Sequence, residues 1–449
     1  MEIKTSAAPV DSSTAPTMDW LTSQWLALGV DCCEAANFEA AIDAFEQALA
    51  LLPDCPLALH GLGIAFNAVG AHADAIAPLE KLLDADPLNG DAWGNYGHAL
   101  AGLERYGDAL AAYRHSLALV PEAPLSWYNC ARVLFEMGRY GEAATACDRA
   151  RELAPEDALI WFWSGQIFRK LERDEQALAA FERSLAIAPQ QPRAWNHRGV
   201  LLEAFGRHGE ALASYDRAIA LEPDYAEAWN NRGITLDNQG QSLEALEAFQ
   251  TSLRHDDHNP DAWNNYGLTL AGTGRHGEAV TAYDHAILLT DRQYWRAWVN
   301  RGWALLACQG LDAALANWEA GLQSLAPDHP QGQLARGLLK YHQGRAHGAT
   351  ADAATASDMA QIHWQQAWGH FSEALEVLTA EAFPHWRLEV LQDAIAVCRS
   401  LGETHQMRYL LQSAMDLLRR LVRETASTSK KVEYAARLAS FYQQGGKMP

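Results

Sequence analysis

Histidine and cysteine are the side chains of this chain with the most obvious capacity for chemistry. The 449 residues include 17 His and seven Cys. The cysteines are scattered, odd in number and without a C-x-x-C pair, which is typical of reduced thiols and not of a metal site. The adjacent Cys32 and Cys33 leave two interpretations open, a redox pair or core packing. Phosphate-binding glycine motifs, G-x-S-x-G and H-E-x-x-H are absent from the sequence. We therefore expect no catalytic residue, no cofactor and no metal.

One short histidine cluster stands out. His255 and His258 flank Asp256 and Asp257, and these residue types are metal ligands. The alternative, which we favour, is a solvated turn after a helix. His208 and His276 each follow a Gly-Arg pair in a predicted turn, so we assign them a role in that turn.

Asparagine recurs in a pattern that suits peptide binding. It stands two residues after a Trp at five places, and a side-chain amide can both donate to and accept from a polypeptide backbone. Asn is also a poor helix former, costing about 0.5 kcal/mol against Ala. Two interpretations are open: the amides grip an extended polypeptide, or they merely face water. The recurring residues are Asn95, Asn129, Asn231, Asn265 and Asn300, with Asn196, Asn230 and Asn264 as neighbours able to share the role.

Aromatic and basic residues interrupt this asparagine pattern in the middle of the chain. They would suit an aromatic or acidic side chain, or a terminal carboxylate, through stacking and charge-assisted hydrogen bonds. The alternative is that Phe135 or Phe162 packs against a neighbouring helix while the cations pair with Glu136 and Glu203. The candidate residues are Tyr128, Arg132, Phe135, Phe162, Trp163, Gln166, Arg169, Lys170, Arg193 and His197.

Tryptophan spacing identifies the elements that must carry these side chains. Trp93 to Trp263 recur every 34 residues, Trp25 precedes Trp93 by two periods, and Trp298 follows Trp263 by 35 residues. A 34-residue period with helix–turn–helix chemistry is typical of tetratricopeptide repeats. The sequence resembles that family in its recurring Trp, Gly, Ala, aromatic and Pro positions. The sixth repeat shows them as Trp195, Gly199, Ala211, Tyr215, Ala218 and Pro223.

The resemblance implies an all-α, right-handed solenoid in which helix A of each repeat lines the concave groove. Packing explains the motif: Trp at position 4 fills the space between helices, small residues at positions 8 and 20 allow close approach, and a large residue at position 24 contacts the next repeat. The Gly of the A-to-B turn supplies a left-handed helix stop. Nine repeats are predicted, at 22–55, 56–89, 90–123, 124–157, 158–191, 192–225, 226–259, 260–293 and 295–328.

The segments outside the array differ from it. We expect residues 1–21 to be disordered, and 329–449 to form a C-terminal helical block, with helices near 331–346, 359–380, 384–401, 404–424 and 429–444 and a loop over Gly348–Ser357. Trp364-Gln-Gln-Ala-Trp368, Phe383-Pro384 and Leu388-Glu-Val-Leu-Gln392 resemble the helical region that joins a repeat array to a caspase-like CHAT protease domain in bacterial, notably cyanobacterial, proteins. No strand-rich region is present to hold the His and Cys of such a protease, so only the adaptor part of the resemblance applies.

Charge and hydropathy narrow the function classes. The net charge is −21, and residues 1–90 alone hold 13 acidic residues against Lys4 and Lys81. An acidic surface argues against nucleic-acid binding, although the acidic first repeats either attract a basic partner or only keep the array soluble. With no signal peptide and no long apolar run, we expect a cytoplasmic protein without membrane insertion, most simply a monomer.

Together these features predict a noncatalytic scaffold that binds a protein or peptide partner in the concave groove. The alternative is the regulatory, or sensor, half of a protease of the CHAT type. The recurring asparagines, called the asparagine column below, are also similar to the asparagine ladder of the transferase that attaches N-acetylglucosamine to Ser and Thr. A third interpretation is therefore the repeat domain of a glycosyltransferase. The absence of a nucleotide-binding segment in the sequence disfavours it.

Overall fold

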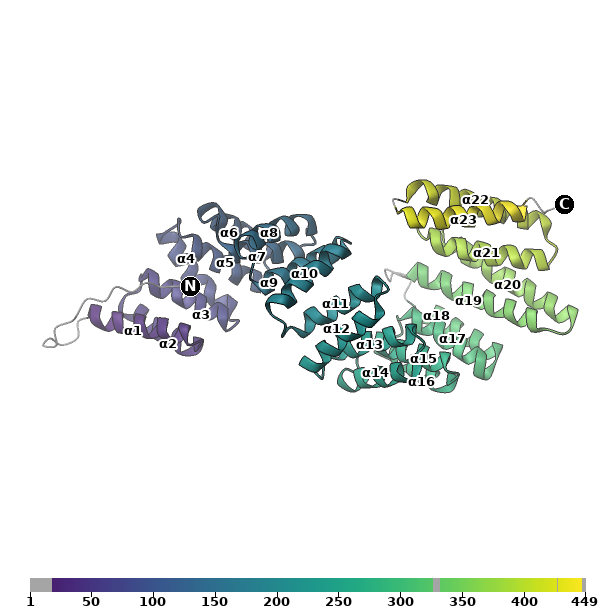
Figure 1. Cartoon of the computed structure of the whole chain (residues 1–449), viewed down its shortest axis with the longest axis horizontal. Helices are drawn as coiled ribbons and strands as arrows, with labels where there is room; N and C mark the ends of the chain where they lie inside the picture. Colours follow the sequence, from purple (N-terminus) through teal and green to yellow (C-terminus); the bar gives the residue numbers. More distant parts are fainter. Residues whose placement is uncertain (1–17, 326–331, 426, 446–449) are drawn as a thin grey trace. The chain divides into compact units, whose positions relative to one another are not determined.

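The computed structural model describes residues 18–325, 332–425 and 427–445, and these contain 23 α-helices and no strand (Figure 1). The all-α prediction is confirmed. Helix α1 begins at Met18, so the last four residues of the segment expected to be disordered are helical, and residues 1–17 lie outside the described part. The chain divides into two compact units, Met1–Arg207 and His208–Pro449.

The first unit is a series of paired helices in which each helix contacts the next along the chain. Its helices are α1 (Met18–Glu34), α2 (Phe38–Leu51), α3 (Pro56–Ala68), α4 (His72–Ala85), α5 (Gly90–Gly102), α6 (Tyr106–Leu119), α7 (Pro124–Glu136), α8 (Tyr140–Leu153), α9 (Ala158–Lys170), α10 (Asp174–Ile187) and α11 (Pro192–Ala204). Odd numbers correspond to the predicted A helices and even numbers to the B helices.

The second unit continues with short paired helices and ends in longer ones. The paired helices are α12 (His208–Leu221), α13 (Ala226–Asn238), α14 (Ser242–His255), α15 (Pro260–Gly272), α16 (His276–Leu289), α17 (Trp295–Gln309) and α18 (Leu311–Ser324). The longer helices are α19 (Gly332–Ala353), α20 (Ser357–Val377), α21 (Pro384–Ser400), α22 (Thr404–Glu424) and α23 (Thr428–Gly445).

The periodic tryptophans fix where the A helices begin. Each donates its indole Nε1–H to the backbone carbonyl six residues earlier, at 2.8–3.0 Å, in the turn that ends the preceding B helix. Because the acceptor belongs to the backbone, Asp257 and Arg292 serve as well as Pro. The donors are Trp93, Trp127, Trp161, Trp195, Trp229, Trp263 and Trp298.

The A-to-B turns contain the predicted left-handed residue. Gly138 and Gly274 have φ of 72° and 80°, which confirms the glycine stop. Glu104 and Glu172 adopt φ of 58° and 56° in other turns, a conformation that costs a residue with a side chain about 1–2 kcal/mol. The repeat geometry therefore overrides local preference at these turns.

Small residues at position 8 let the two helices of a repeat approach closely. A Cβ added to Gly267 would lie 2.6 Å from Cε1 of Tyr283, and one added to Gly165 would lie 2.7 Å from the ring of Phe181. Both rings are buried. The side chain at position 24 thus occupies the space that glycine leaves open in its own repeat. Phe181 also contacts the next repeat, as predicted, because its ring stacks on that of His197 with centroids 5.4 Å apart.

The C-terminal helices enclose a core of their own, centred on residues such as Phe371, Leu391 and Leu418. The loop expected over Gly348–Ser357 is shorter than predicted, because α19 continues to Ala353 and α20 begins at Ser357, which leaves residues 354–356 between them. The first residue of the stretch lies at a helix contact: a Cβ added to Gly348 would lie 3.5 Å from the ring of Trp364 on α20. Alanine is also the best helix former, so this stretch favours a helix once α20 covers it.

We expect Gly267→Ala to lower the free energy of unfolding by about 1–3 kcal/mol, because the added methyl overpacks the Tyr283 ring. Gly277→Ala is the matched control, since a Cβ there meets nothing within 4 Å, and it should change stability by less than about 1 kcal/mol. Chemical denaturation of the whole chain measures both. Equal effects of the two substitutions would contradict the packing role.

Candidate functional site

Helices α7, α9 and α11 of the first unit carry the aromatic and basic residues predicted from the sequence. Tyr128 is buried, Phe162, Trp163 and Arg169 are half-buried, and Arg132 is exposed. We call this set the basic–aromatic patch. It comprises Tyr128, Arg132, Phe135, Phe162, Trp163, Gln166, Arg169, Lys170, Arg193 and His197.

The aromatic rings of the patch brace one another across neighbouring helices. Phe135 and Phe162 meet Trp163 edge-on, with ring centroids 5.6 and 6.3 Å apart, and Phe162 also contacts Phe181 on α10 at 5.7 Å. The packing interpretation is therefore correct for both phenylalanines. Trp163 is held between them while remaining half-buried, so its position is fixed and part of its surface is open.

The cations of the patch are not neutralised by acidic side chains. Among the described residues, no carboxylate lies within 4.0 Å of Arg132, Arg169, Lys170 or Arg193, whereas exposed arginines elsewhere in the unit pair with neighbours, for example Arg149 with Glu152. The expected pairing with Glu136 and Glu203 is therefore not present. Instead, the Arg132 guanidinium lies 5.3 Å from the Trp163 ring centroid and 5.7 Å from that of Tyr128, which positions it while leaving N–H groups for an acceptor.

His197 connects α11 to α9 through both ring nitrogens. Its Nδ1 lies 3.0 Å from Nη1 of Arg169, and its Nε2 lies 2.9 Å from Nε2 of Gln166. Because a guanidinium only donates, Nδ1 of His197 accepts, the ring is neutral and its proton is on Nε2. Nε2 therefore donates to the Gln166 amide when the carbonyl oxygen of that amide faces the ring. Burial, followed by the charges of Arg169 and Arg193, lowers the pKa of His197 to about 4.

Three of the five recurring asparagines bond side chains of the preceding A helix. Asn265 Nδ2 donates to Oδ1 of Asn230 at 3.2 Å, and Asn300 Nδ2 donates to Oδ1 of Asn264 at 2.9 Å. Asn95 Nδ2 likewise lies 2.8 Å from Nε2 of His60. In each case position 6 of one A helix meets position 5 of the A helix before it.

These bonds show that the amides of Asn95, Asn265 and Asn300 do not simply face water and that their Nδ2 atoms are already engaged. Asn265 and Asn300 use their Nδ2 atoms in these bonds and do not use their Oδ1 atoms. Asn129 is buried, and Asn231 lies half-buried on α13.

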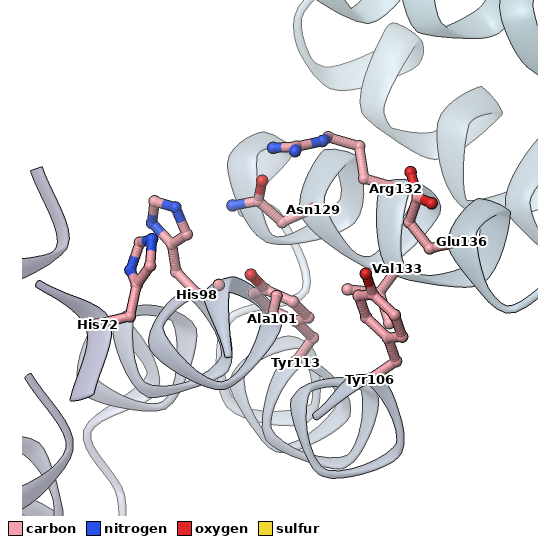
Figure 2. A pocket seen from close by; sticks show the side chains of 10 residues that line it. His72, His98, Ala101, Tyr106, Tyr113, Asn129, Arg132, Val133 and Glu136 are labelled. Carbon is pink, nitrogen blue, oxygen red and sulfur yellow. The ribbon is translucent and has the colours of Figure 1, made fainter. Parts of the chain in front are cut away.

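A small polar cavity beside the patch was not predicted. It has a volume of about 200 Å³ and lies among α4, α5, α6 and α7 (Figure 2). Figure 2 shows the Arg132 guanidinium extending over Asn129, away from the Glu136 carboxylate. Burial, His72 and Arg132 together lower the pKa of His98 in its wall. Its wall is formed by His72, His98, Ala101, Gly102, Tyr106, Tyr113, Asn129, Arg132, Val133 and Glu136.

The positions of these wall residues within their repeats could have predicted that they lie close together. His98 and Arg132 both occupy position 9 of adjacent A helices, while Asn129 occupies position 6. The repeat numbering alone therefore places all three on neighbouring helix surfaces.

The remaining histidine candidates are accounted for by local structure. His258 Nδ1 lies 2.5 Å from Oδ1 of the exposed Asp257 in the turn after α14. His208 and His276 are the first residues of α12 and α16. In the described part of the chain, no group of three His, Cys, Asp or Glu side chains has an arrangement able to hold a metal ion.

Comparison with protein families settles the nature of the repeats. A tetratricopeptide repeat model matches slightly more than half of the chain. The chain belongs to the tetratricopeptide repeat family. The matched segments are 26–89, 70–124, 95–157, 128–192 and 230–297, with a second repeat model at 204–240.

Individual relatives share the repeats. The chain is 34% identical over 83 residues to small glutamine-rich tetratricopeptide repeat-containing protein 2 of Mycosarcoma maydis, a match covering 18% of this chain and 24% of the length of that protein. Among solved structures it is similar to YrrB, described as a tetratricopeptide protein with an unusual peptide-binding site (21% identity, 44% of this chain and 97% of that one, TM-score 0.38). It is also similar to pilF of Pseudomonas aeruginosa (20% identity, 47% and 96%, TM-score 0.43).

Within the described residues, no helix combines the length and apolar character needed to cross a bilayer.

We expect His197 to titrate near pH 4, because burial and two arginines oppose its protonation. Since its ordinary pKa is about 6.5, its contribution to stability is complete above pH 6.5 and declines as the pH falls toward 4. Arg169→Gln should raise the titration midpoint, while Arg149→Gln, on the exposed face of α8, should not. The imidazole proton resonance, assigned by comparison with His197→Asn, measures the midpoint. A wild-type value near 6.5 would contradict this account.

Proposed function

We propose that this chain is a noncatalytic scaffold whose A-helix surface binds an extended segment of a protein partner. Tetratricopeptide repeat proteins form a family of protein-interaction scaffolds, and the paired helices here present no catalytic arrangement among the described residues. The basic–aromatic patch is the binding centre. Within the first unit, the parts of Asn95 and Asn129 that internal bonds leave unused add polar contacts for the backbone of the bound segment. In the second unit, Asn231, Asn265 and Asn300 offer contacts of the same kind.

The observation that carries this proposal is the set of cations without carboxylate partners. In a chain of net charge −21, four basic side chains gather on α7, α9 and α11 without an ion pair. Arg132 is fixed over Trp163, and Arg169 is fixed by His197. Ordering these side chains before binding reduces the entropy that a partner's binding must offset.

The residue types also favour a binding role. Trp, Tyr and Arg dominate the energetically important positions of protein interfaces, and the patch combines all three. A partner with an acidic or aromatic side chain, or a terminal carboxylate, would complement it. The acidic first repeats, residues 22–89, supply an opposite charge for any basic flank of the same partner.

The test is affinity capture from cells of the source organism with the whole chain as bait. We expect the double variant Trp163→Ala with Arg169→Gln to capture about tenfold less of the partner than the wild type, because it removes residues of the kind that dominate binding energy at interfaces. The matched control, Trp386→Ala with Arg149→Gln, changes an exposed Trp and an exposed Arg outside the patch. Equal capture by all three proteins would contradict the proposal.

The alternative places this chain as the sensor part of a CHAT-type cysteine protease. The resemblance over residues 330–445 supports it, together with the apolar core that α19–α23 build among themselves, which α19 joins to the core of the preceding repeats. In that arrangement, partner binding at the patch controls cleavage by a protease domain. Co-purification of a caspase-like protease with the wild-type chain would favour this alternative over the simple scaffold.

A further inference from the structure

A second periodic contact links successive repeats on a different side of the A helices. In five repeats, position 7 of the A helix reaches position 25 of the preceding B helix, sixteen or seventeen residues earlier. In these five an acceptor or amide at position 25 meets a long polar or aromatic side chain from position 7. The pairs are Tyr96 with Glu80 (2.8 Å), Arg198 with Glu182 (3.1 Å), Arg232 with Asp216 (2.8 Å), Tyr266 with Gln250 (2.7 Å) and Arg301 with Asp284 (2.7 Å).

The side chain at position 7 also covers the motif tryptophan of its own repeat. Tyr96 lies edge-on to Trp93, with ring centroids 6.1 Å apart, and Tyr266 lies 6.4 Å from Trp263 in the same manner. Arg198 lies over Trp195 at 5.8 Å. Position 7 therefore fills a slot bounded by the tryptophan and by the preceding B helix.

The fourth repeat departs from this pattern at both positions. Position 7 is Cys130, too short to cross the slot, and position 25 of the preceding helix is Arg114, a donor where the other repeats provide an acceptor or amide. Arg114 has one carboxylate neighbour, Glu142, at 3.9 Å. That carboxylate already accepts two bonds from Arg139, at 2.8 and 2.7 Å.

The fifth repeat shows that a short residue at position 7 need not leave the slot open. Ser164 stands at position 7 there. Arg151 of the preceding helix covers the rings instead, 4.8 Å from the centroid of Trp161 and 5.5 Å from that of Phe168. The opening at the fourth repeat thus arises from the combination of Cys130 with Arg114.

The open slot is a groove of about 440 Å³ between α6, α7 and α8, within the size range of ligand sites in proteins. Its walls are mainly apolar. Burial raises the pKa of the Cys130 thiol to about 11, so that wall is uncharged at neutral pH. The groove is lined by Leu110, Arg114, Leu117, Ala118, Trp127, Cys130, Leu134, Glu142, Thr145 and Ala146.

We propose that this groove binds the side chain of a tyrosine from a protein partner. The aromatic ring takes the place against Trp127 that Tyr96 and Tyr266 take against the tryptophans of their own repeats. The phenol oxygen accepts a hydrogen bond from the guanidinium of Arg114, which stands where Glu80 and Gln250 meet those two hydroxyls. Gln250 donates to the Tyr266 oxygen in the same way, and because a guanidinium can only donate, Arg114 selects an occupant that accepts at this end. The site is separate from the basic–aromatic patch and does not rest on its function.

The test uses methyl NMR of the whole chain with N-acetyl-L-tyrosinamide as the probe. We expect saturable shifts of the Leu117 and Leu134 methyl resonances at probe concentrations up to about 10 mM. Cys130→Tyr should abolish them, because its own side chain fills the groove as in the third and eighth repeats. Cys308→Tyr is the matched control, since Cys308 is exposed in the other unit, and it should bind the probe as the wild type does.

A second variant keeps the result independent of any folding defect in Cys130→Tyr. Arg114→Met leaves the groove open at an exposed position, keeps a side chain of similar length and removes the donor without supplying a strong acceptor, so it should weaken probe binding several-fold. N-acetyl-L-phenylalaninamide, which lacks the hydroxyl, should bind the wild type more weakly by a similar factor. No shift in the wild type, shifts that persist in Cys130→Tyr, or equal binding of the two probes would each overturn the proposal.

Discussion

The repeats depend on a hydrogen bond from each motif indole to the carbonyl that closes the preceding B helix. An indole N–H in an otherwise apolar contact requires a partner, and in these repeats the partner is the backbone carbonyl six residues earlier. The bond therefore fixes the start of each A helix relative to the helix before it. No repeat buries its own surfaces alone, so this repeated placement determines which side chains of neighbouring A helices meet, including those of the basic–aromatic patch.

The sequence predicted the helices of the array well because the signals were local and repeated. Tryptophan spacing, turn glycines and prolines each indicate where a helix begins or ends, and the same indication recurs in the neighbouring repeats. The exception was Gly348–Ser357, where small residues suggested a loop. Gly348 faces Trp364 of a helix that comes later in the chain, and that contact is not visible in the local pattern.

The candidate site was predicted in part. Repeat numbering correctly placed Arg132, Trp163 and His197 on neighbouring A helices. It did not reveal that His197 bonds Arg169 and Gln166, or that Asn265 and Asn300 bond amides of the preceding helix. Those outcomes depend on rotamers and on distances between helices, which a repeat period constrains but does not specify. The asparagine column consequently serves the stacking of repeats first, and any contact with a partner uses what remains of each amide.

The use of a backbone carbonyl as the acceptor for each indole has an evolutionary consequence. Substitution of the residue that carries the carbonyl leaves the bond intact, as Asp257 and Arg292 illustrate. Side chains in the turns between repeats can therefore be substituted without changing how successive helices are placed. Surface chemistry at these turns can diversify one repeat at a time, and a count of repeats based on proline would miss units whose geometry is unchanged.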